Sequence, residues 1–398
     1  MAEHIVKEKH LIPLGEDRFI NHPWFGRQFM PGQDFIGPDG FISLDEAAET
    51  ARNSGKRIIL NIGDSSTAGW DSRVGLENKK RRANELPLIL PLFQYSTYSE
   101  LLRDKVGNEL VVLNAGIPGH TTLQGLRRNR MLLSALKARG VSPDYVSFYF
   151  GDNDSQWENN VEDKYRLRSH LPRFLDMKRV KSRKPDTQRI HLRTSLPDFE
   201  ANMRTMVRDA RHFGAAPILI LPQTPIYWKP ANRYVSDNFV IQDDAHAGHL
   251  VTAALAKATQ LWEQAKDTAW STKKDHDLRM ARELDFLVPR VKAAYRRTLE
   301  SLSRDMDLPL IDITVPREQN DANLFVDYCH PINQAGSMII DQLIEAIDAC
   351  DEGQYRSSSS LLTRFLSTPA MDFVDRLLPR RHPSITVGED NLDISSLY

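Results

Sequence analysis

Short apolar runs, each ending in a turn of small and polar residues, recur along the chain. The first, residues 57–62, is apolar at four of its six positions, as expected for a strand buried on both faces of a sheet. Similar runs follow at 110–114, 145–150, 216–221 and 308–313. Segments with helical periodicity stand between or beside them, at 43–54, 123–140, 199–213 and 333–349. Strands that alternate with helices predict a three-layer α/β/α sandwich around a central, mostly parallel five-stranded sheet.

The spacing of these elements predicts three parts of the chain. Residues 1–56 form an N-terminal arm, rich in Pro and Gly at 21–41, followed by the first helix. Residues 57–350 form the main domain, and 351–398 form a linker and a C-terminal helical appendage. The main domain carries three helical or irregular insertions, at about 71–100, 155–196 and 225–300.

The overall composition is that of an ordinary globular protein. Among 398 residues, 52 Lys and Arg balance 53 Asp and Glu, so no nucleic-acid partner is expected. The first ten residues lack the apolar core of a secretory signal, and no run approaches the roughly 18 apolar residues of a transmembrane helix. With only two cysteines, Cys329 and Cys350, the sequence predicts a cytoplasmic protein without a transmembrane segment.

The turn that follows the first strand carries candidate chemistry. Residues 63–69 read Gly-Asp-Ser-Ser-Thr-Ala-Gly, and active sites of open α/β sheets gather at the carboxyl ends of strands. Ser65 is therefore a candidate nucleophile, which needs a base, an orienting acid and oxyanion donors elsewhere in the chain. The structural alternative is a Ser/Thr cluster that caps a helix.

Three further turns complete a recognisable set. Small polar turns follow the second and third strands, and a fourth lies before the last helix: Asn114-Ala115-Gly116, Gly151-Asp152-Asn153-Asp154 and Asp327-Tyr328-Cys329-His330. With Gly63-Asp64-Ser65 at the first strand, these four blocks resemble, in order, those of the SGNH hydrolases, also called the GDSL esterase/lipase superfamily. The resemblance covers about 57–349 and implies the flavodoxin-like fold of that superfamily.

The resemblance implies a role for each matching residue. Ser65 would be the nucleophile, His330 the general base and acid, and Asp327 the group that orients the imidazole. The oxyanion hole would comprise the Ser65 and Gly116 N–H groups and the Asn153 side-chain amide. No metal or cofactor is implied. Taken one at a time, Gly116 could serve a tight turn, Asn153 a helix cap and His330 a structural contact.

Three other candidate groups compete with this interpretation. Ser66 is a rival nucleophile, although the family pattern places the nucleophile directly after Asp64. Residues 243–249 contain two carboxylates and two histidines that could bind a metal on one helical face, but a solvated helix start explains them too. Cys329, beside the proposed base, could suggest a thiol nucleophile, and we interpret it as a packing residue.

The expected function is that of a serine esterase. The preferred substrate is a short acyl ester, acetyl in particular, of a carbohydrate or other small polar molecule. Alternatives are an O-acyltransferase that uses the same site and a non-catalytic binding module. Residues 161–193 hold 11 Lys or Arg against 4 Asp or Glu, and a second basic run lies at 79–82. They form either a solvated face or a positive rim that would favour an anionic substrate.

The C-terminal appendage contains two short apolar segments, 361–366 and 371–378. Their spacing predicts helices that pack on the body of the protein or on a second copy, with membrane-surface association as a further alternative. The pattern does not indicate an oligomeric state.

Overall fold

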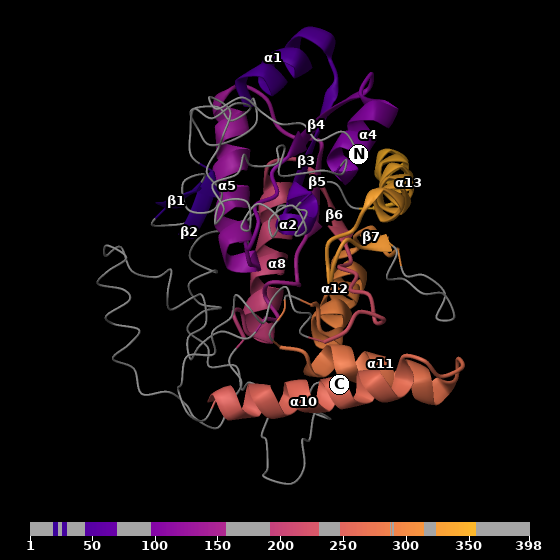
Figure 1. The fold of residues 1–398 in the computed structure, drawn as a ribbon. Helices are drawn as coiled ribbons and strands as arrows, with labels where there is room; N and C mark the ends of the chain where they lie inside the picture. The colour runs from indigo at the N-terminus through magenta and orange to yellow at the C-terminus, as the bar shows by residue number, and fades with distance from the viewer. Residues whose placement is uncertain are drawn as a thin grey trace, which may run out of the picture.

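A central sheet with helices on both faces forms the body of the protein (Figure 1). The computed structural model describes residues 19–22, 26–29, 44–69, 97–156, 192–230, 247–286, 288, 290–313 and 324–355. The sheet comprises β3 (Arg57–Gly63), β4 (Leu110–Asn114), β5 (Tyr145–Tyr149), β6 (Ala216–Ile220) and β7 (Leu310–Ile311). Their order is β4-β3-β5-β6-β7, and every pairing is parallel. The predicted five-stranded sheet is confirmed.

Helices cover the two faces as separate layers, so the predicted three-layer sandwich is also confirmed. One face is covered by α1 (Leu44–Ser54), α5 (Thr122–Ala138), α8 (Leu196–His212) and α12 (Ala293–Met306). The other is covered by α4 (Tyr98–Val106) and α13 (Asn333–Asp351). The remaining described elements are β1 (Phe19–His22), β2 (Gly26–Phe29), α2 (Ser65–Ala68), α10 (Ala247–Ala265) and α11 (Thr272–Leu284).

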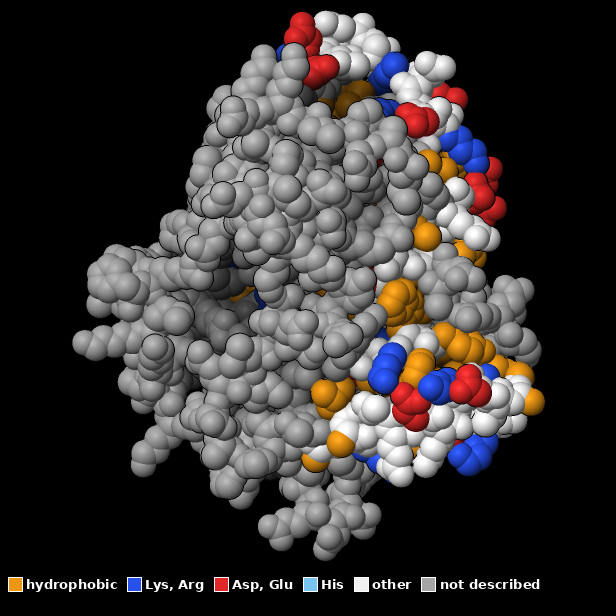
Figure 2. Space-filling model, in the orientation of Figure 1, with side chains coloured by type: hydrophobic (Ala, Val, Ile, Leu, Met, Phe, Trp, Pro, Cys, Tyr) orange, Lys and Arg blue, Asp and Glu red, His pale blue; other side chains and the backbone are white. Residues whose placement is uncertain are grey.

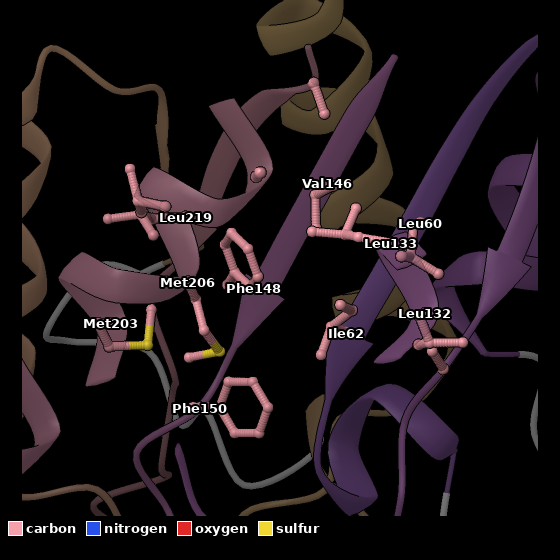
Figure 3. Close-up of a cluster of buried hydrophobic side chains, with 14 of the residues drawn as sticks. Leu60, Ile62, Leu132, Leu133, Val146, Phe148, Phe150, Met203, Met206 and Leu219 are labelled. Carbon is pink, nitrogen blue, oxygen red and sulfur yellow. The ribbon is translucent and has the colours of Figure 1, made fainter. Parts of the chain in front are cut away.

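Alternation along β3 assigns its side chains to the two layers. Ile58, Leu60 and Ile62 pack in the cluster that contains α5 and α8, whereas Ile59 packs in the cluster that contains α4 and α13. Successive side chains of a strand point to opposite faces, and both faces are covered, which is why this run is almost continuously apolar. Figure 3 shows the first cluster, with Leu60 and Ile62 beside side chains from the neighbouring strand and helices.

Asn61 is the polar exception within β3, and its hydrogen bonds are satisfied inside the core. Its side chain is fully buried. The amide donates to Ser99 Oγ at 2.9 Å, and its oxygen accepts from Ser147 Oγ at 2.6 Å. A buried amide with donor and acceptor both paired avoids the desolvation cost of an unpaired polar group. The three side chains therefore join β3, β5 and α4.

Three local features differ from the sequence expectations. Helix α4 begins directly after a capping box, in which the side chains of Thr97 and Glu100 each accept the other's backbone N–H. This helix-start signal lies within the stretch 71–100 that was expected to be an insertion. The N-terminal arm contains an antiparallel pair, β1 with β2. Helix α12, which begins inside the stretch expected as the third insertion, packs with Tyr295 and Leu299 in the main core.

Helices α10 and α11 form a pair at one end of the body (Figure 1). A small separate cluster of Ile226, Ala265 and Leu278 supports them, and Trp262 packs beside it. Figure 2 shows Lys and Arg side chains mixed with Asp and Glu side chains over the described residues at this end of the molecule. None of the described helices combines the length and hydropathy that crossing a bilayer requires.

Candidate active site

The chain order of the strands brings three turns together. β4 pairs with one edge of β3, and β5 pairs with the other edge. Successive strands are therefore added on opposite sides of β3, which makes β3 a topological switch point. The carboxyl ends of strands at such a switch point border the crevice where open α/β sheets bind ligands. Ser65, Gly116 and Asn153 each lie just beyond one of these three strands.

A tight strand-to-helix turn holds Ser65 at the start of α2. Asp64 caps this helix by accepting a 2.9 Å hydrogen bond from the Ser66 N–H, and Gly69 ends the helix in a left-handed conformation, φ 77°. A Cβ at Gly63 would lie 1.9 Å from Thr67 Oγ1, so only glycine fits where the turn leaves β3. The first N–H groups of a helix have no acceptor within the helix, which leaves the Ser65 N–H available for an acceptor outside it.

The structure brings Ser65, His330 and Asp327 into a hydrogen-bonded line. His330 Nε2 lies 2.7 Å from Ser65 Oγ, and His330 Nδ1 lies 2.7 Å from Asp327 Oδ2. All three residues are buried, with between 4% and 7% of each exposed. These are the contacts that a serine nucleophile, its base and an orienting acid require.

The loop before α13 fixes the imidazole and its carboxylate together. Val326 N–H donates to the His330 carbonyl at 2.9 Å, and Phe325 and Pro331 form a β-bridge across the loop. Asp327 Oδ1 accepts the N–H groups of Cys329 and His330, both at 2.9 Å. Oδ1 is thus occupied by the backbone, and Oδ2 faces the imidazole. The short loop sets the geometry that the three-residue spacing predicted.

Asn153 lies beside the serine turn and is linked to it. Its Nδ2 donates to Asp64 Oδ2 at 3.0 Å. A side-chain amide has two N–H donors, so a second N–H is left for an acceptor in the site. Asp64, which sequence analysis quoted only as part of a motif, therefore orients Asn153 as well as capping the helix that carries Ser65.

The Gly116 N–H, predicted as an oxyanion donor, is bonded within the protein. It donates to Asn114 Oδ1 at 3.0 Å, and Asn114 Nδ2 donates to the Thr67 carbonyl at 2.9 Å. The position still requires glycine for a different reason: a Cβ there would lie 2.3 Å from the Ala68 backbone nitrogen. Gly116 thus lets the turn after β4 pack against α2.

Gly119, three residues farther on, is a site residue that sequence analysis missed. His120 N–H donates to the Ile117 carbonyl at 3.2 Å, which closes a turn with Pro118 and Gly119 at its corner. Gly119 has φ 79°, the value that a type II turn demands at this position. Among the described residues, none accepts a hydrogen bond from the Gly119 N–H. The Pro-Gly pair was the sequence signal for this turn.

Arg193 joins the turn after β4 to the turn after β5, and it too was missed as an individual residue. Its Nη2 donates to the Gly119 carbonyl at 2.8 Å, and its Nη1 lies 3.5 Å from Asn153 Oδ1. In the sequence, Arg193 is only the last residue of the basic stretch 161–193. No local motif marks it, because its contacts are with residues 40 and 74 positions away in the sequence.

Three buried carboxyl groups surround these turns. Burial raises the pKa of Asp64 to about 6 against the hydrogen bond from Ser66 N–H, which lowers it. Burial also raises the pKa of Asp152 well above its usual range, and the nearby Asp64 raises it further. For Asp154, burial raises the pKa to about 7 despite hydrogen bonds from Thr122. Desolvation is the leading cause at all three positions.

Asp154 provides a test of this electrostatic picture through stability. Its folded-state pKa of about 7 exceeds the usual value of 3.8, so the folded protein binds an extra proton between about pH 4 and pH 7. The stability that this proton supplies is full below pH 4 and is lost as the pH rises to 7. An Asp154→Asn variant keeps an oxygen for the Thr122 N–H and hydroxyl, which now donate at 2.9 and 2.6 Å.

We expect the stability of Asp154→Asn, relative to the unsubstituted protein, to rise across that interval. The slope is at most about 1.4 kcal/mol per pH unit. Urea unfolding at pH 5, 6 and 7 measures it. A stability difference that stays constant over the three pH values would contradict the buried, protonated carboxyl.

One group of described residues has the donor types of a metal site. Asp327, Cys329 and His330 place a carboxylate oxygen, a thiol sulfur and an imidazole nitrogen within 4.8 Å of one another. Asp327 Oδ2 already bonds to His330 Nδ1, and His330 Nε2 bonds to Ser65 Oγ, so a metal would compete with these contacts. Burial raises the pKa of the Cys329 thiol well above its usual range, which disfavours a thiolate ligand or nucleophile.

Several sequence candidates lie outside the described residues. They are the basic run at 79–82, residues 161–191 of the basic insertion, residues 243–246 of the candidate metal group and the appendage from 356 onward. Residues 247–249 begin α10, but their side chains are not described.

A parallel sheet with Ser, His and Asp joined at its carboxyl edge is the arrangement of serine-dependent hydrolases. The model of the GDSL-like lipase/acylhydrolase family matches residues 62–337. The chain belongs to this family, whose members hydrolyse carboxylic esters. A search of curated protein sequences gives no match.

A search of solved structures gives matches of low identity that span most of this chain. A catalytic mutant of Axe2, an acetylxylan esterase from Geobacillus stearothermophilus, is 16% identical, with 76% of this chain and 97% of that chain covered and a TM-score of 0.37. LAE5, an alpha/beta hydrolase enzyme from the metagenome of Lake Arreo, is 16% identical over 74% and 95%, with a TM-score of 0.37. A carbohydrate acetylesterase family member from Sinorhizobium meliloti is 13% identical over 75% and 99%, with a TM-score of 0.35.

Proposed function

We propose that this chain hydrolyses a short acyl ester through an acyl-enzyme formed on Ser65. The observation that carries the proposal is the 2.7 Å contact between Ser65 Oγ and His330 Nε2. It is supported by the contact between His330 Nδ1 and Asp327, which selects the tautomer with a lone pair on Nε2. A serine hydroxyl without such a base is a weak nucleophile.

The chemistry follows from the roles we assign to these residues. Ser65 Oγ attacks the ester carbonyl carbon while His330 Nε2 takes the hydroxyl proton. The tetrahedral intermediate then breaks its bond to the alcohol oxygen, which receives that proton from His330. Water, deprotonated by the same imidazole, attacks the acyl-enzyme, and the acid leaves as Ser65 regains its proton.

The negative oxygen of the tetrahedral intermediate needs hydrogen-bond donors. We assign this role to the Ser65 N–H at the start of α2 and to the second N–H of the Asn153 amide. Gly119 replaces Gly116 as the proposed third donor, because the Gly116 N–H is bonded to Asn114. Each such donor contributes about 3 to 4 kcal/mol to the stability of the transition state.

For the acyl group we propose acetyl, carried by a sugar or another small polar molecule. The support is the resemblance of residues 63–69 to the opening of family members that deacetylate carbohydrates. We further propose that the substrate is anionic, because the basic stretches at 79–82 and 161–193 would attract negative charge. An O-acyltransferase that delivers the acyl group to an alcohol instead of water is the second candidate, since both reactions share the same acyl-enzyme.

A substrate panel tests acyl length and acceptor together. p-Nitrophenyl acetate, butyrate and octanoate are compared with acetylated sugars, each with and without free sugar as acceptor. We expect kcat/KM to be highest for acetate and free acetic acid to be the product. A preference for octanoate would contradict the acyl assignment, and an acyl-sugar product would favour the transferase. If kcat/KM had the same salt dependence for anionic and neutral acetate esters, the proposed positive rim would be contradicted.

A further inference from the structure

The guanidinium of Arg193 lies between the turn after β4 and the turn after β5. The proposed mechanism assigns it no role. Arg193 directly precedes Thr194, in a described segment that is hydrogen-bonded to the turn after β5. Two backbone hydrogen bonds join residues 193–194 to residues 154–156. Arg193 N–H donates to the Gln156 carbonyl at 2.9 Å, and Thr194 N–H donates to the Asp154 carbonyl at 3.1 Å. The backbone thus fixes Arg193 next to the segment that carries Asn153.

The Asn153 amide lies between opposite charges. Its Oδ1 lies 3.5 Å from Arg193 Nη1, and its Nδ2 donates to Asp64 Oδ2 at 3.0 Å. Rotating the amide by 180° would set its NH₂ group against the guanidinium and its oxygen against the carboxylate. Both contacts would then be repulsive, because a guanidinium offers only donors and a carboxylate only acceptors. The pair of charges therefore selects one orientation.

The same guanidinium holds a second turn in place. Arg193 Nη2 donates to the Gly119 carbonyl at 2.8 Å. A planar guanidinium presents several donors in a fixed fork, so one group can set the spacing between the turns after β4 and β5. A lysine ammonium has the charge but lacks the fork. Arg193 also lowers the pKa of the buried Asp64 carboxyl, which favours the ionised acceptor of the Asn153 amide.

We propose that Arg193 is a positioning residue of the oxyanion site, which acts by orienting the Asn153 amide and the Gly119 turn. The inference rests on the proposed function, because it assigns Arg193 to the donors that serve the Ser65 reaction. Substitution of Arg193 should therefore destabilise the transition state, which lowers kcat, and leave the affinity for the substrate almost unchanged. Loss of one oxyanion donor lowers kcat by about 10²- to 10³-fold, and this bounds the effect of losing its orientation.

A double-mutant cycle between Arg193 and Asn153 tests the inference. We expect Arg193→Met to lower kcat for p-nitrophenyl acetate by about 10- to 100-fold, with KM changed by less than about threefold. In an Asn153→Ala background the same substitution should lower kcat by a factor at least about threefold smaller, because the amide is gone and only the Gly119 turn is left for Arg193 to position. Arg193→Lys should recover only part of the loss.

The matched control is Arg130→Met. Arg130 pairs with Asp209 at 2.7 Å between α5 and α8, so its substitution should leave kcat unchanged. Should Arg193→Met fail to fold, as judged by its thermal unfolding, Arg193→Lys is carried through the same cycle. The rate of labelling by a fluorophosphonate provides a second readout for every variant.

The outcomes separate the two proposals. Multiplicative losses in the double variant, a loss confined to KM, or full activity in Arg193→Met would overturn the positioning role while Ser65-dependent hydrolysis remains. Hydrolysis that persists in Ser65→Ala would instead overturn the proposed function, and the role of Arg193 with it.

Discussion

Replacement of Ser65 by alanine should lower the rate of p-nitrophenyl acetate hydrolysis by at least about 10⁴-fold. The substitution removes the hydroxyl oxygen that lies 2.7 Å from His330 Nε2. It removes just one oxygen from a buried side chain, so the fold should be retained. Steady-state kinetics, with a circular-dichroism melt of both proteins, measures the effect.

Ser66→Ala is the matched control for this experiment. Ser66 is the neighbouring serine and is also buried, but its hydroxyl makes a long 3.5 Å contact with the Cys329 carbonyl. Its backbone N–H, which bonds to Asp64, is kept in the alanine variant. We expect activity within about threefold of the unsubstituted protein. If Ser66→Ala abolished hydrolysis and Ser65→Ala did not, the nucleophile would have been assigned to the wrong serine.

The second large effect is expected at Asp327. In an Asp327→Asn variant, the amide oxygen can still accept the backbone N–H groups of Cys329 and His330, now at 2.9 Å. The NH₂ group then faces His330 Nδ1, which must accept instead of donate. The proton of the imidazole moves to Nε2, and the base can no longer accept the Ser65 proton. We expect kcat to fall by about 10⁴-fold.

Kinetics at several pH values, with thermal unfolding as a check on the fold, measure the Asp327 effect. Asp341→Asn serves as the control, because that carboxylate makes only an exposed ion pair with Lys105 at 2.7 Å among the contacts described. An Asp327→Asn variant with wild-type kcat would show that the 2.7 Å contact to His330 Nδ1 does not set the imidazole tautomer.

The sheet could be predicted from sequence because its strands are buried on both faces. The run at 57–62 is apolar and short, and the structure has β3 at Arg57–Gly63. β4 has the predicted bounds of 110–114. β7 is shorter than the run at 308–313 because only Leu310 and Ile311 pair with β6. An apolar pattern reports burial, whereas the length of a strand depends on its partner.

The candidate site was predictable where sequence spacing determines geometry. Asp327 and His330, three residues apart, lie on one loop and meet directly. Ser65 meets them because the carboxyl end of β3 and the loop before α13 share one edge of the sheet. The four blocks carried this information, since each block contains both the turn and the functional side chain.

The remaining features depend on contacts that no local pattern encodes. Gly116 is a glycine because α2 packs against it, and its N–H is taken by Asn114. Both facts require knowledge of the neighbouring turn. Arg193 reaches Gly119 across 74 residues of sequence, so its role follows only from the path of the chain. Helix α4, by contrast, was marked by the capping box of Thr97 and Glu100.

The central claim is that Ser65 becomes covalently modified through the help of His330, and covalent labelling tests it most directly. The protein is treated with a fluorophosphonate, digested and analysed by peptide mass spectrometry. We predict one adduct, on the peptide that contains Ser65, and its loss in Ser65→Ala and in His330→Ala. An adduct on another residue, or ester hydrolysis that continues while Ser65 stays unmodified, would contradict the account.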